Sequence, residues 1–563
     1  MKLNNQFLRL HAHYGHHEAV DITLAELAAT LECTHRNAML IVNNMAEHGW
    51  IAWESHRGRG RRSRLRFLIQ PEEIAVQSIM QSINRRDLKR TLEQISLHSR
   101  SSSLQDRLQG WLLTYFGHHS EIRSDKQIDT LRLPIRERLH TVDPLYMNLL
   151  AESFVSSHVF GGLVRRRVHS DEIVPNIAHA WELDESRIRW TFFLRKEVLF
   201  HNGKIMTAAD VVYSFERLIN SSRRTLYSFI FKQIKAVRAR NATTVTIELE
   251  EPSELFLPFL CTSRAAIVPK DLDQLSEAGF GTRPIGTGPF KVAEMNESIC
   301  VLEAFAHYFQ ERAHLDRVEI VHVPWELQNS ASSDNLLPFH VIQNPSSADS
   351  AWSQIHSDAA VRKFITCNTK KAGPLTDPTV RAHLFACLRD DSGDAADSVH
   401  EQAKVSEFPC ILQIATIPPY KQDAENAAAK LAKFGYACKV VFTSPEDFKG
   451  SIRLESDLIL FSLLRDQDEQ LRLFDLYLTI SGHVEPHTRV DIEQSLQAVK
   501  READTHLRSQ QYERIEARLI QENQLHILYE KPVQTSYLPS IRGVSFNSQG
   551  WVDLRKLWYP VDH

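Results

Sequence analysis

The sequence predicts a multidomain protein: a small α+β winged helix-turn-helix, a helical connector and a large α/β domain. Three observations predict this fold class. Two short helix patterns separated by a turn lie near the N-terminus, an arginine-rich loop between strand-like segments follows, and mixed strand and helix patterns fill the remainder. At 563 residues the chain is also too long for one ordinary domain. We place the domains at residues 1–70, 71–126 and 127–563.

A pair of predicted helices joined by a short turn comes first. Thr23 and Glu26 form a capping box, which satisfies two free amides at a helix start. Apolar residues at helical spacing follow, and after a turn at residues 32–33 Thr34 can cap a second helix that ends at Gly49. In a helix-turn-helix the second helix enters the major groove of DNA. The segment therefore predicts contact with double-stranded DNA.

The arginine-rich loop lies between two predicted strands, residues 50–53 and 64–69. Residues 55–63 of this loop include no acidic residue, and Gly58 and Gly60 allow the bends of a hairpin tip. A helix-turn-helix followed by such a hairpin is a winged helix, whose arginines can neutralise phosphates or enter a narrow minor groove. The alternative is a solvated basic loop without a partner.

The candidate DNA contacts fall in two groups, the start of the second helix and the wing. Arg36 can pair with guanine and Asn37 with adenine, or each can contact a phosphate, which positions the protein without reading sequence. The wing arginines are expected to supply affinity rather than sequence choice. The predicted DNA-binding residues are Thr34, His35, Arg36, Asn37, Arg57, Arg59, Arg61 and Arg62.

The charge distribution agrees with a local DNA-binding signal. The chain has a net charge of −4, whereas residues 1–70 hold nine basic and six acidic side chains, a net charge of +3. The rest therefore carries −7, which discourages nonspecific coating of DNA. The apolar content of 43% is that of a folded globular protein.

Signals for export, membrane insertion, metal binding and catalysis are missing from the sequence. The first residues lack the apolar core of a secretory signal, and no window approaches 18 uninterrupted apolar residues. The seven cysteines form neither a zinc pair nor a disulfide frame, and the 27 histidines include no His-Glu-x-x-His motif. We expect a cytoplasmic protein that is not an enzyme, with no catalytic residues, metal or cofactor and no membrane contact.

Residues 71–117 have an amphipathic helical pattern with a polar break at residues 99–103. A helical connector between two domains is the simpler interpretation. A dimerisation segment is the alternative, because regulators of this kind often read paired half-sites as homodimers.

The large domain opens with a predicted strand at residues 128–134 and then shows a dense run of motifs. We predict a short helix over residues 177–181, a strand containing Trp190 and Phe192, a turn at Asn202-Gly203 and a helix capped by Thr207. A tight turn at residues 286–289 and a strand at residues 315–323 follow. Trp181, Trp190 and the turn at residues 286–289 are interpreted as structural, so no ligand-binding residue is predicted.

These motifs resemble the family 5 extracellular solute-binding proteins, which serve peptide, nickel and opine transporters. The likeness rests on Ile177-Ala178-x-x-Trp181, Phe192-Phe193-Leu194-Arg195, Asn202-Gly203, Thr207-Ala208-Ala209-Asp210-Val211 and Gly286-Thr287-Gly288-Pro289. It covers residues 127–325 and returns at residues 541–547 and 551–558, with Asn202 where the family has aspartate. The resemblance implies a bilobal α/β periplasmic-binding-protein-like (type II) domain with a small-molecule ligand in the interlobe cleft.

A winged helix in front of such a domain is similar to the SgrR family of cytoplasmic transcription regulators. The resemblance implies a ligand sensor that alters DNA binding, and it associates the chain with sugar-phosphate stress. The ligand, the operator and the sign of regulation stay open. One alternative is a solute-binding protein of an ABC-type transport system with an accessory N-terminal domain, and another is a constitutive DNA-binding protein whose large domain is a scaffold.

Overall fold

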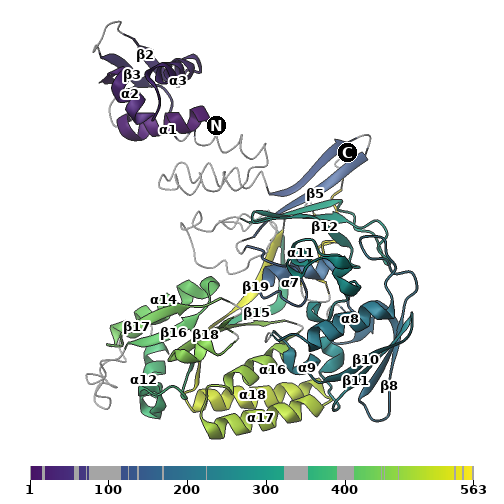
Figure 1. Ribbon diagram of the computed structural model, residues 1–563. Coiled ribbons are helices and arrows are strands. Elements are labelled where there is room, and N and C mark those ends of the chain that lie inside the picture. The colour runs from purple at the N-terminus through teal and green to yellow at the C-terminus, as the bar shows by residue number, and fades with distance from the viewer. Residues whose placement is uncertain are drawn as a thin grey trace. The chain divides into compact units, whose positions relative to one another are not determined.

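The chain forms two compact units, seen in the computed structural model of Figure 1. The N-terminal unit holds Met1–Gly117, and the C-terminal unit holds His118–Val321 and Leu336–His563. The structure describes residues 2–15, 19–55, 62–71, 73–74, 116–123, 126–135, 138–167, 170–222, 225–322, 353–389, 411–444, 447–448, 450–466, 468–537, 541–547 and 551–560.

The N-terminal unit is a winged helix-turn-helix, as predicted. In the described residues up to Phe67, three antiparallel strands in the order β1-β3-β2 accompany the helices α1, α2 and α3, and apolar side chains from every one of these elements meet in one core. Helix α1 was not anticipated from the sequence, and it contributes Phe7 and Leu10 to that core. The elements are α1 (Lys2–Tyr14), β1 (Val20–Ile22), α2 (Leu24–Thr30), α3 (His35–Glu47), β2 (Ile51–Glu54) and β3 (Ser63–Phe67).

Both predicted caps of the helix pair are present. The amide of Thr23 donates to Glu26 Oε2 at 2.8 Å, and the amide of Glu26 donates to Thr23 Oγ1 at 3.3 Å. Thr34 caps α3 by accepting a hydrogen bond from the amide of Asn37 at 3.4 Å. The side chains therefore start both helices where the sequence indicates.

Most of the predicted helical connector, residues 71–126, lies outside the described residues. Its described end differs from the prediction, because Gly117–Arg123 forms strand β4 rather than helix. This strand is hydrogen-bonded beside β5 (Lys126–Ile135) at the edge of a five-stranded sheet. Pairing with β5 supplies the backbone hydrogen bonds that a helix would otherwise make.

The first lobe of the C-terminal unit comprises the described residues between 126 and 322 together with 541–560. One sheet has the order β12-β13-β14-β5-β4, a second has the order β10-β11-β9-β8, and β6 pairs with β7. The further strands are β6 (Val164–Arg166), β7 (Ile173–Pro175), β8 (Ala178–Leu183), β9 (Arg189–Leu194), β10 (Ile234–Asn241), β11 (Thr244–Leu249), β12 (Phe290–Met295), β13 (Ile299–Ala304) and β14 (Arg317–His322). The helices are α7 (Leu150–Val159), α8 (Ala208–Ile219), α9 (Ser228–Phe231), α10 (Phe256–Phe259) and α11 (Glu277–Thr282), with 3-10 turns at Ser263–Ala265 and Lys270–Gln274.

The second lobe comprises the described residues between 353 and 537. Its mixed sheet has the order β17-β16-β18-β15-β19, in which β16 runs parallel to β17 and β18 while β15 runs antiparallel to β18 and β19. The strands are β15 (Ser353–Cys367), β16 (Leu412–Thr416), β17 (Cys438–Phe442), β18 (Leu458–Arg465) and β19 (Leu525–Tyr537). The helices are α12 (Pro378–Arg389), α14 (Lys421–Lys433), α16 (Glu469–Ile480), α17 (Pro486–Arg501) and α18 (Thr505–Gln521). Two lobes built on separate sheets confirm the predicted bilobal α/β fold.

One hydrophobic core joins the two lobes. It contains residues of β9, β11 and α10 together with residues of β18, α16, α17 and α18. Phe229 of α9 stacks on Phe474 of α16 with ring centroids 4.0 Å apart. Figure 1 shows α9 beside the α16–α18 group, which agrees with this contact. The lobes therefore pack closely on the side formed by these helices.

The chain returns to the first lobe after β19. His158 of α7 contacts this returning segment, since its Nε2 lies 3.1 Å from the carbonyl oxygen of Val552 and 3.2 Å from the amide of Leu554. Burial lowers the pKa of His158, which favours the neutral ring. The segment thus ends as part of the first lobe, where Leu554 and Leu557 are fully buried.

One predicted element is wrong. Residues 177–181 were expected to form a short helix, but Ala178–Leu183 forms strand β8, which pairs antiparallel with β9. The predicted strand around Trp190 and Phe192 is that partner. Pairing with a strand later in the chain decided the conformation, because local sequence preference is weak compared with a full set of ladder contacts.

The other motifs of this lobe have the predicted structures. Gly203 has a φ of +82° in the turn at Asn202-Gly203, and Thr207 caps α8. Trp190 is buried, and Trp181 packs against the same core. The structural interpretation of these motifs is confirmed.

The turn at Gly286-Thr287-Gly288-Pro289 is required by close packing. A Cβ atom at Gly286 would lie 2.0 Å from the carbonyl oxygen of Val159, and one at Gly288 would lie 2.5 Å from that of His158. Only glycine lets the two backbone segments approach this closely. The two glycines therefore let the turn pack directly against the end of α7.

Candidate nucleic-acid interface and ligand pocket

The exposed face of α3 presents polar side chains at its start. Thr34, His35, Arg36 and Asn37, four of the predicted DNA-binding residues, are all exposed there. The opposite face is apolar and buried in the core of the N-terminal unit through Ala38, Ile41, Val42 and Met45. The helix is thus anchored by one face and leaves its first turn open to a partner.

The same exposed face continues along the helix beyond the predicted residues. Leu40, Asn43 and Asn44 are exposed, and they follow Arg36 by four, seven and eight residues. Side chains at this spacing share one face of a helix. Sequence reasoning stopped at the first turn, although the spacing from Arg36 was a signal that could have extended the set.

Strand β3 adds a second basic surface. Arg64 and Arg66 are exposed while Leu65 between them is fully buried, as expected of a strand with one face on the core. Arg64 lies directly opposite Asp21 of β1 and Glu54 of β2, whereas Arg66 lies opposite Ala52. Opposite charges in such cross-strand positions attract, so Arg66 is the better placed of the two for an external anion.

Of the predicted wing arginines, the structure describes Arg62, which is exposed directly before β3. Hydrogen bonds from Thr23 lower the pKa of Glu26, and the charge of Arg62 lowers it further. Arg62 is therefore near the start of α2. Arg57, Arg59 and Arg61 lie outside the described residues.

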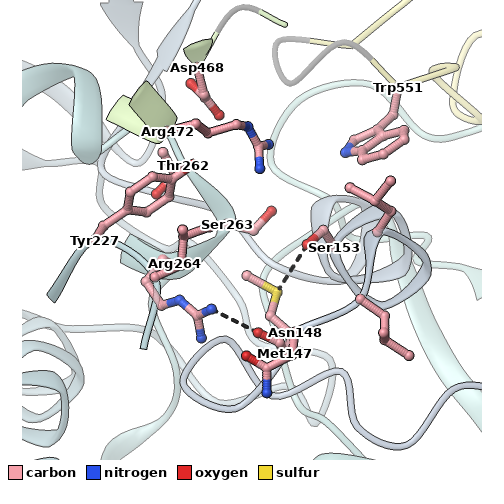
Figure 2. Close-up of a pocket in the computed structure, with 13 residues that line it drawn as sticks. Met147, Asn148, Ser153, Tyr227, Thr262, Ser263, Arg264, Asp468, Arg472 and Trp551 are labelled. Carbon is pink, nitrogen blue, oxygen red and sulfur yellow. Dashed lines mark hydrogen bonds between the residues drawn. The ribbon is translucent and has the colours of Figure 1, made fainter. Parts of the chain in front are cut away.

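A pocket opens between the two lobes of the C-terminal unit. Its cavity volume is about 60 Å³, and it is partly open to solvent. In the view of Figure 2, Tyr227 and Trp551 lie on opposite sides, with the Arg472 guanidinium between them. The first lobe contributes Met147, Asn148, Leu149, Leu150, Ser153, Leu226, Tyr227, Thr262, Ser263, Arg264 and Trp551, and the second contributes Asp468 and Arg472.

Buried charges meet on the second-lobe side of this pocket. Arg472 donates from Nε and Nη2 to Asp466 at 3.2 and 2.9 Å, and Asp468 lies 3.5 Å from Arg166 of the first lobe. Burial and repulsion from Asp466 raise the pKa of Asp468 to about 6. The side chains of Arg166 and Asp468 are each only 8% exposed, so this ion pair is a buried link between the lobes.

Arg264 organises the opposite wall. Its Nη1 donates to the carbonyl oxygens of Pro144 and Leu145 at 2.6 Å, and its Nη2 donates to that of Met147 at 2.7 Å (Figure 2 shows the last of these). Burial lowers the pKa of Arg264 to about 10, which leaves the group charged at neutral pH. The guanidinium therefore holds the loop before α7 in the conformation that lines the pocket.

Tyr227 forms the edge of the pocket next to α9. Its φ of +66° is in the left-handed region, where a residue other than glycine is uncommon. Backbone strain of this kind often marks binding sites. Sequence reasoning named none of the lining residues, because they come from five separate segments of the chain.

The described residues contain neither a metal-binding cluster nor a membrane-spanning helix. No group of three or more histidine, cysteine, aspartate or glutamate side chains is arranged to hold a metal ion in that part of the chain. Among the helices that the structure describes, none is long and apolar enough to cross a membrane.

Two families match separate parts of the sequence. Residues 2–118 match the family described as "Sugar transport-related sRNA regulator N-term", and residues 172–439 match "Bacterial extracellular solute-binding proteins, family 5 Middle". The first region contains the winged helix-turn-helix, and the second contains much of both lobes. The two matches agree with the division of the chain into two units.

The relatives of the chain include both regulators and proteins without an assigned role. Uncharacterized protein YhjP of Bacillus subtilis (strain 168) is 27% identical over 97% of this chain and 97% of its own length. HTH-type transcriptional regulator SgrR of Pectobacterium atrosepticum is 31% identical over 58% of this chain and 55% of its own length. The chain thus aligns with little more than half of that SgrR protein.

A solved structure supports the fold of the C-terminal unit. The ABC transporter-associated periplasmic binding protein DppA from Helicobacter pylori, in complex with the peptide STSA, aligns with a TM-score of 0.59. It is 19% identical, and the alignment covers 76% of this chain and 98% of DppA. At this identity the likeness shows the type II periplasmic-binding-protein fold alone. The winged helix-turn-helix, the region that matches the family 5 proteins and the aligned SgrR relatives together make this chain similar to the SgrR transcription regulators.

Proposed function

We propose that this protein is a ligand-responsive transcription regulator of the bacterial cytoplasm. It binds double-stranded DNA through α3 and the wing, and it senses a small metabolite in the interlobe pocket. The observation that carries the proposal is the exposed polar face of α3, together with the exposed arginines of β3, in a unit that matches the regulator family. The matches to SgrR regulators disfavour the alternative of a transporter solute-binding protein.

The exposed residues divide by role in this proposal. Arg36 and Asn37 face base edges in the major groove, where a guanidinium pairs with guanine and an amide with adenine. Arg62 and Arg66, with Arg57, Arg59 and Arg61 of the wing, contact phosphates and supply affinity that salt weakens. Thr34 and His35 lie at the N-terminus of α3, where a phosphate is favoured by the helix dipole and free amides.

The DNA-binding part of the proposal is tested by fluorescence anisotropy with the full chain. The probes are DNA upstream of its own gene, a duplex selected from a random-sequence pool, and unselected DNA, each across a salt series. Arg36→Ala is expected to cost about 1–3 kcal/mol and to relax specificity, because it removes a base contact. Arg66→Ala is expected to weaken binding to all duplexes. It should also reduce by about 1 the slope of the logarithm of affinity against the logarithm of salt concentration, because one phosphate contact is lost.

Arg514→Ala is the matched control, because Arg514 is an exposed arginine on α18 of the other unit. It should leave all affinities unchanged. Equal affinity for selected and unselected DNA would contradict the regulator assignment. Light scattering of the free and DNA-bound protein tests the further proposal that a homodimer reads paired half-sites.

The pocket has the chemistry of a site for a small polar metabolite. Thr262 and Ser263 carry hydroxyls, Arg472 supplies a cation, and Trp551 offers an aromatic face. A sugar phosphate is the first class to test, since the matched family is described as sugar transport-related. A ligand that binds the folded protein raises its melting temperature, so a thermal-shift panel of sugar phosphates and the parent sugars addresses the proposal directly.

Coupling between the pocket and the DNA is the last part of the proposal. A ligand changes DNA affinity only if it binds two conformations of the protein unequally. Anisotropy titrations at saturating ligand should therefore shift the affinity for the selected duplex. A ligand that raises the melting temperature and leaves both DNA affinity and transcription unchanged would argue against sensing.

A further inference from the structure

Leu40 is an exposed apolar residue within the polar face of α3. Its exposed fraction is 61%, the largest of the exposed large hydrophobic side chains described in the N-terminal unit. The apolar residues that anchor the helix lie on its other face and are buried. Leu40 therefore adds nothing to the core of the unit, and its apolar surface faces solvent in the free protein.

The neighbours of Leu40 on this face are polar residues of the types that can hydrogen-bond to base edges. Arg36 precedes it by one helical turn, and Asn43 and Asn44 follow it by one turn. An apolar side chain between them cannot make a polar base contact. The matching apolar group in the major groove is the 5-methyl group of thymine, which no other standard base presents there.

We propose that Leu40 selects thymine at one position of the DNA site by packing against its 5-methyl group. This inference rests on the proposed function, because it requires α3 to lie in the major groove. It assigns to Leu40 a contact that depends on base identity, in contrast to the phosphate contacts of the wing. It also explains why the exposed polar face of α3 carries a leucine, although a polar side chain at this position would interact better with water.

The experiment removes the methyl group from the DNA and the leucine from the protein. A duplex is first selected from a random-sequence pool with the full chain, and each of its thymines is then replaced singly by deoxyuridine. Deoxyuridine keeps the base pair and lacks only the methyl group. Affinities are measured by anisotropy for the unsubstituted protein, Leu40→Ala and Leu507→Ala, the last being a control at an exposed leucine of α18.

The expected result is a loss of about fourfold in affinity at one thymine of the selected site for the unsubstituted protein, the value of one buried methyl group. Leu40→Ala should bind the thymine duplex more weakly and should not respond to deoxyuridine at that position. Leu507→Ala should behave as the unsubstituted protein. Unchanged melting temperatures establish that each variant is folded.

Three results would overturn the inference while leaving DNA binding in place. They are a selected site without thymine, an unsubstituted protein that is indifferent to every deoxyuridine, and a Leu40→Ala variant that keeps the full response. If no sequence-selective duplex emerges from the pool, the proposed function itself fails and this inference falls with it.

Discussion

At the scale of single residues, His201 shows how a buried polar group holds the turn at Gly286-Thr287-Gly288-Pro289. Its Nδ1 accepts a hydrogen bond from the amide of Gly286 at 3.2 Å, and its Nε2 donates to the carbonyl oxygen of Gly288 at 3.0 Å. Both ring nitrogens are therefore used by the neutral form. Burial lowers the pKa of His201 to about 4, because the charged form loses its hydration.

The depressed pKa of His201 predicts a loss of stability in acid. The unfolded chain binds the proton near pH 6.5 and the folded chain only near pH 4, so stability is complete above pH 6.5 and falls between these values. Denaturant titrations from pH 7 to pH 4 measure how the free energy of unfolding depends on pH. His201→Gln should make this dependence weaker. The pKa of His526 is also lowered, to about 4, and that of His483 to about 3, so some slope should remain.

His506→Gln is the control for this experiment, because His506 is exposed on α18. It should leave the pH dependence as it is in the unsubstituted protein. A slope that is identical in the unsubstituted protein and in His201→Gln would show that His201 does not contribute.

Gly286 allows a second prediction at the residue scale. Gly286→Ala places a Cβ atom 2.0 Å from the carbonyl oxygen of Val159, and backbone must move to relieve the contact. We expect a cost of about 3 kcal/mol or more in the free energy of unfolding, measured by denaturant titration. Gly482→Ala, with a closest contact of 3.1 Å to the carbonyl oxygen of Thr479, should cost less. Equal effects of the two substitutions would contradict this account.

At the scale of elements, α8 depends on a carboxylate that joins two segments. Asp210 Oδ2 accepts hydrogen bonds from the amide and hydroxyl of Thr207 at 2.7 and 3.0 Å. Asp210 Oδ1 accepts one from the amide of Lys270 at 2.8 Å. The same side chain therefore starts the helix and fixes the 3-10 turn at Lys270–Gln274 against it.

Removal of this carboxylate should destabilise the first lobe. Asp210→Ala is expected to cost about 1–2 kcal/mol of unfolding free energy, the usual value of a lost helix cap. Asp210→Asn keeps one acceptor oxygen and should cost less. Calorimetry of both variants checks the order of their unfolding free energies. An Asp210→Ala variant as stable as the unsubstituted protein would mean that water replaces the carboxylate without loss of stability.

At the scale of the whole molecule, the C-terminal unit is held together by contacts between lobes as well as within them. The Phe229–Phe474 stack and the Arg166–Asp468 pair both cross from one lobe to the other. Lys500 of α17 also pairs with Glu251 of the first lobe. The pocket lies beside these contacts, so the lobe arrangement and the ligand site depend on each other.

The Arg166–Asp468 pair gives a prediction at this scale. Arg166→Met leaves Asp468 buried beside Asp466 with one cation fewer, and loss of one partner of a buried pair typically costs about 3–5 kcal/mol. Arg166→Met combined with Asp468→Leu should recover most of this loss, because the other carboxylate that Arg166 contacts, Asp171, is largely exposed and the double variant leaves no buried charge of the pair unpaired. Denaturant unfolding of the single and double variants measures the difference, and additive losses would show that the two residues do not interact.

The candidate DNA interface was predictable in part. A cap at Thr34 sets the start of α3 and so predicts Arg36 and Asn37, whereas no local pattern indicates that Leu40 is exposed. The pocket was expected between the lobes, but its lining was not predicted. Asp468 and Arg472 are far from Met147, Tyr227 and Trp551 in the chain, and no local pattern relates them.

The sequence by itself determined the elements whose causes are local: the caps at Thr23, Thr34 and Thr207, the turn at Gly203, and the strands with alternating burial. These features depend on side chains and backbone angles within a few residues. Tertiary structure decided that Ala178–Leu183 is a strand, that Gly286 must be glycine, and that Arg166 meets Asp468. Each of these depends on a partner distant in sequence, and only the packed chain brings such partners together.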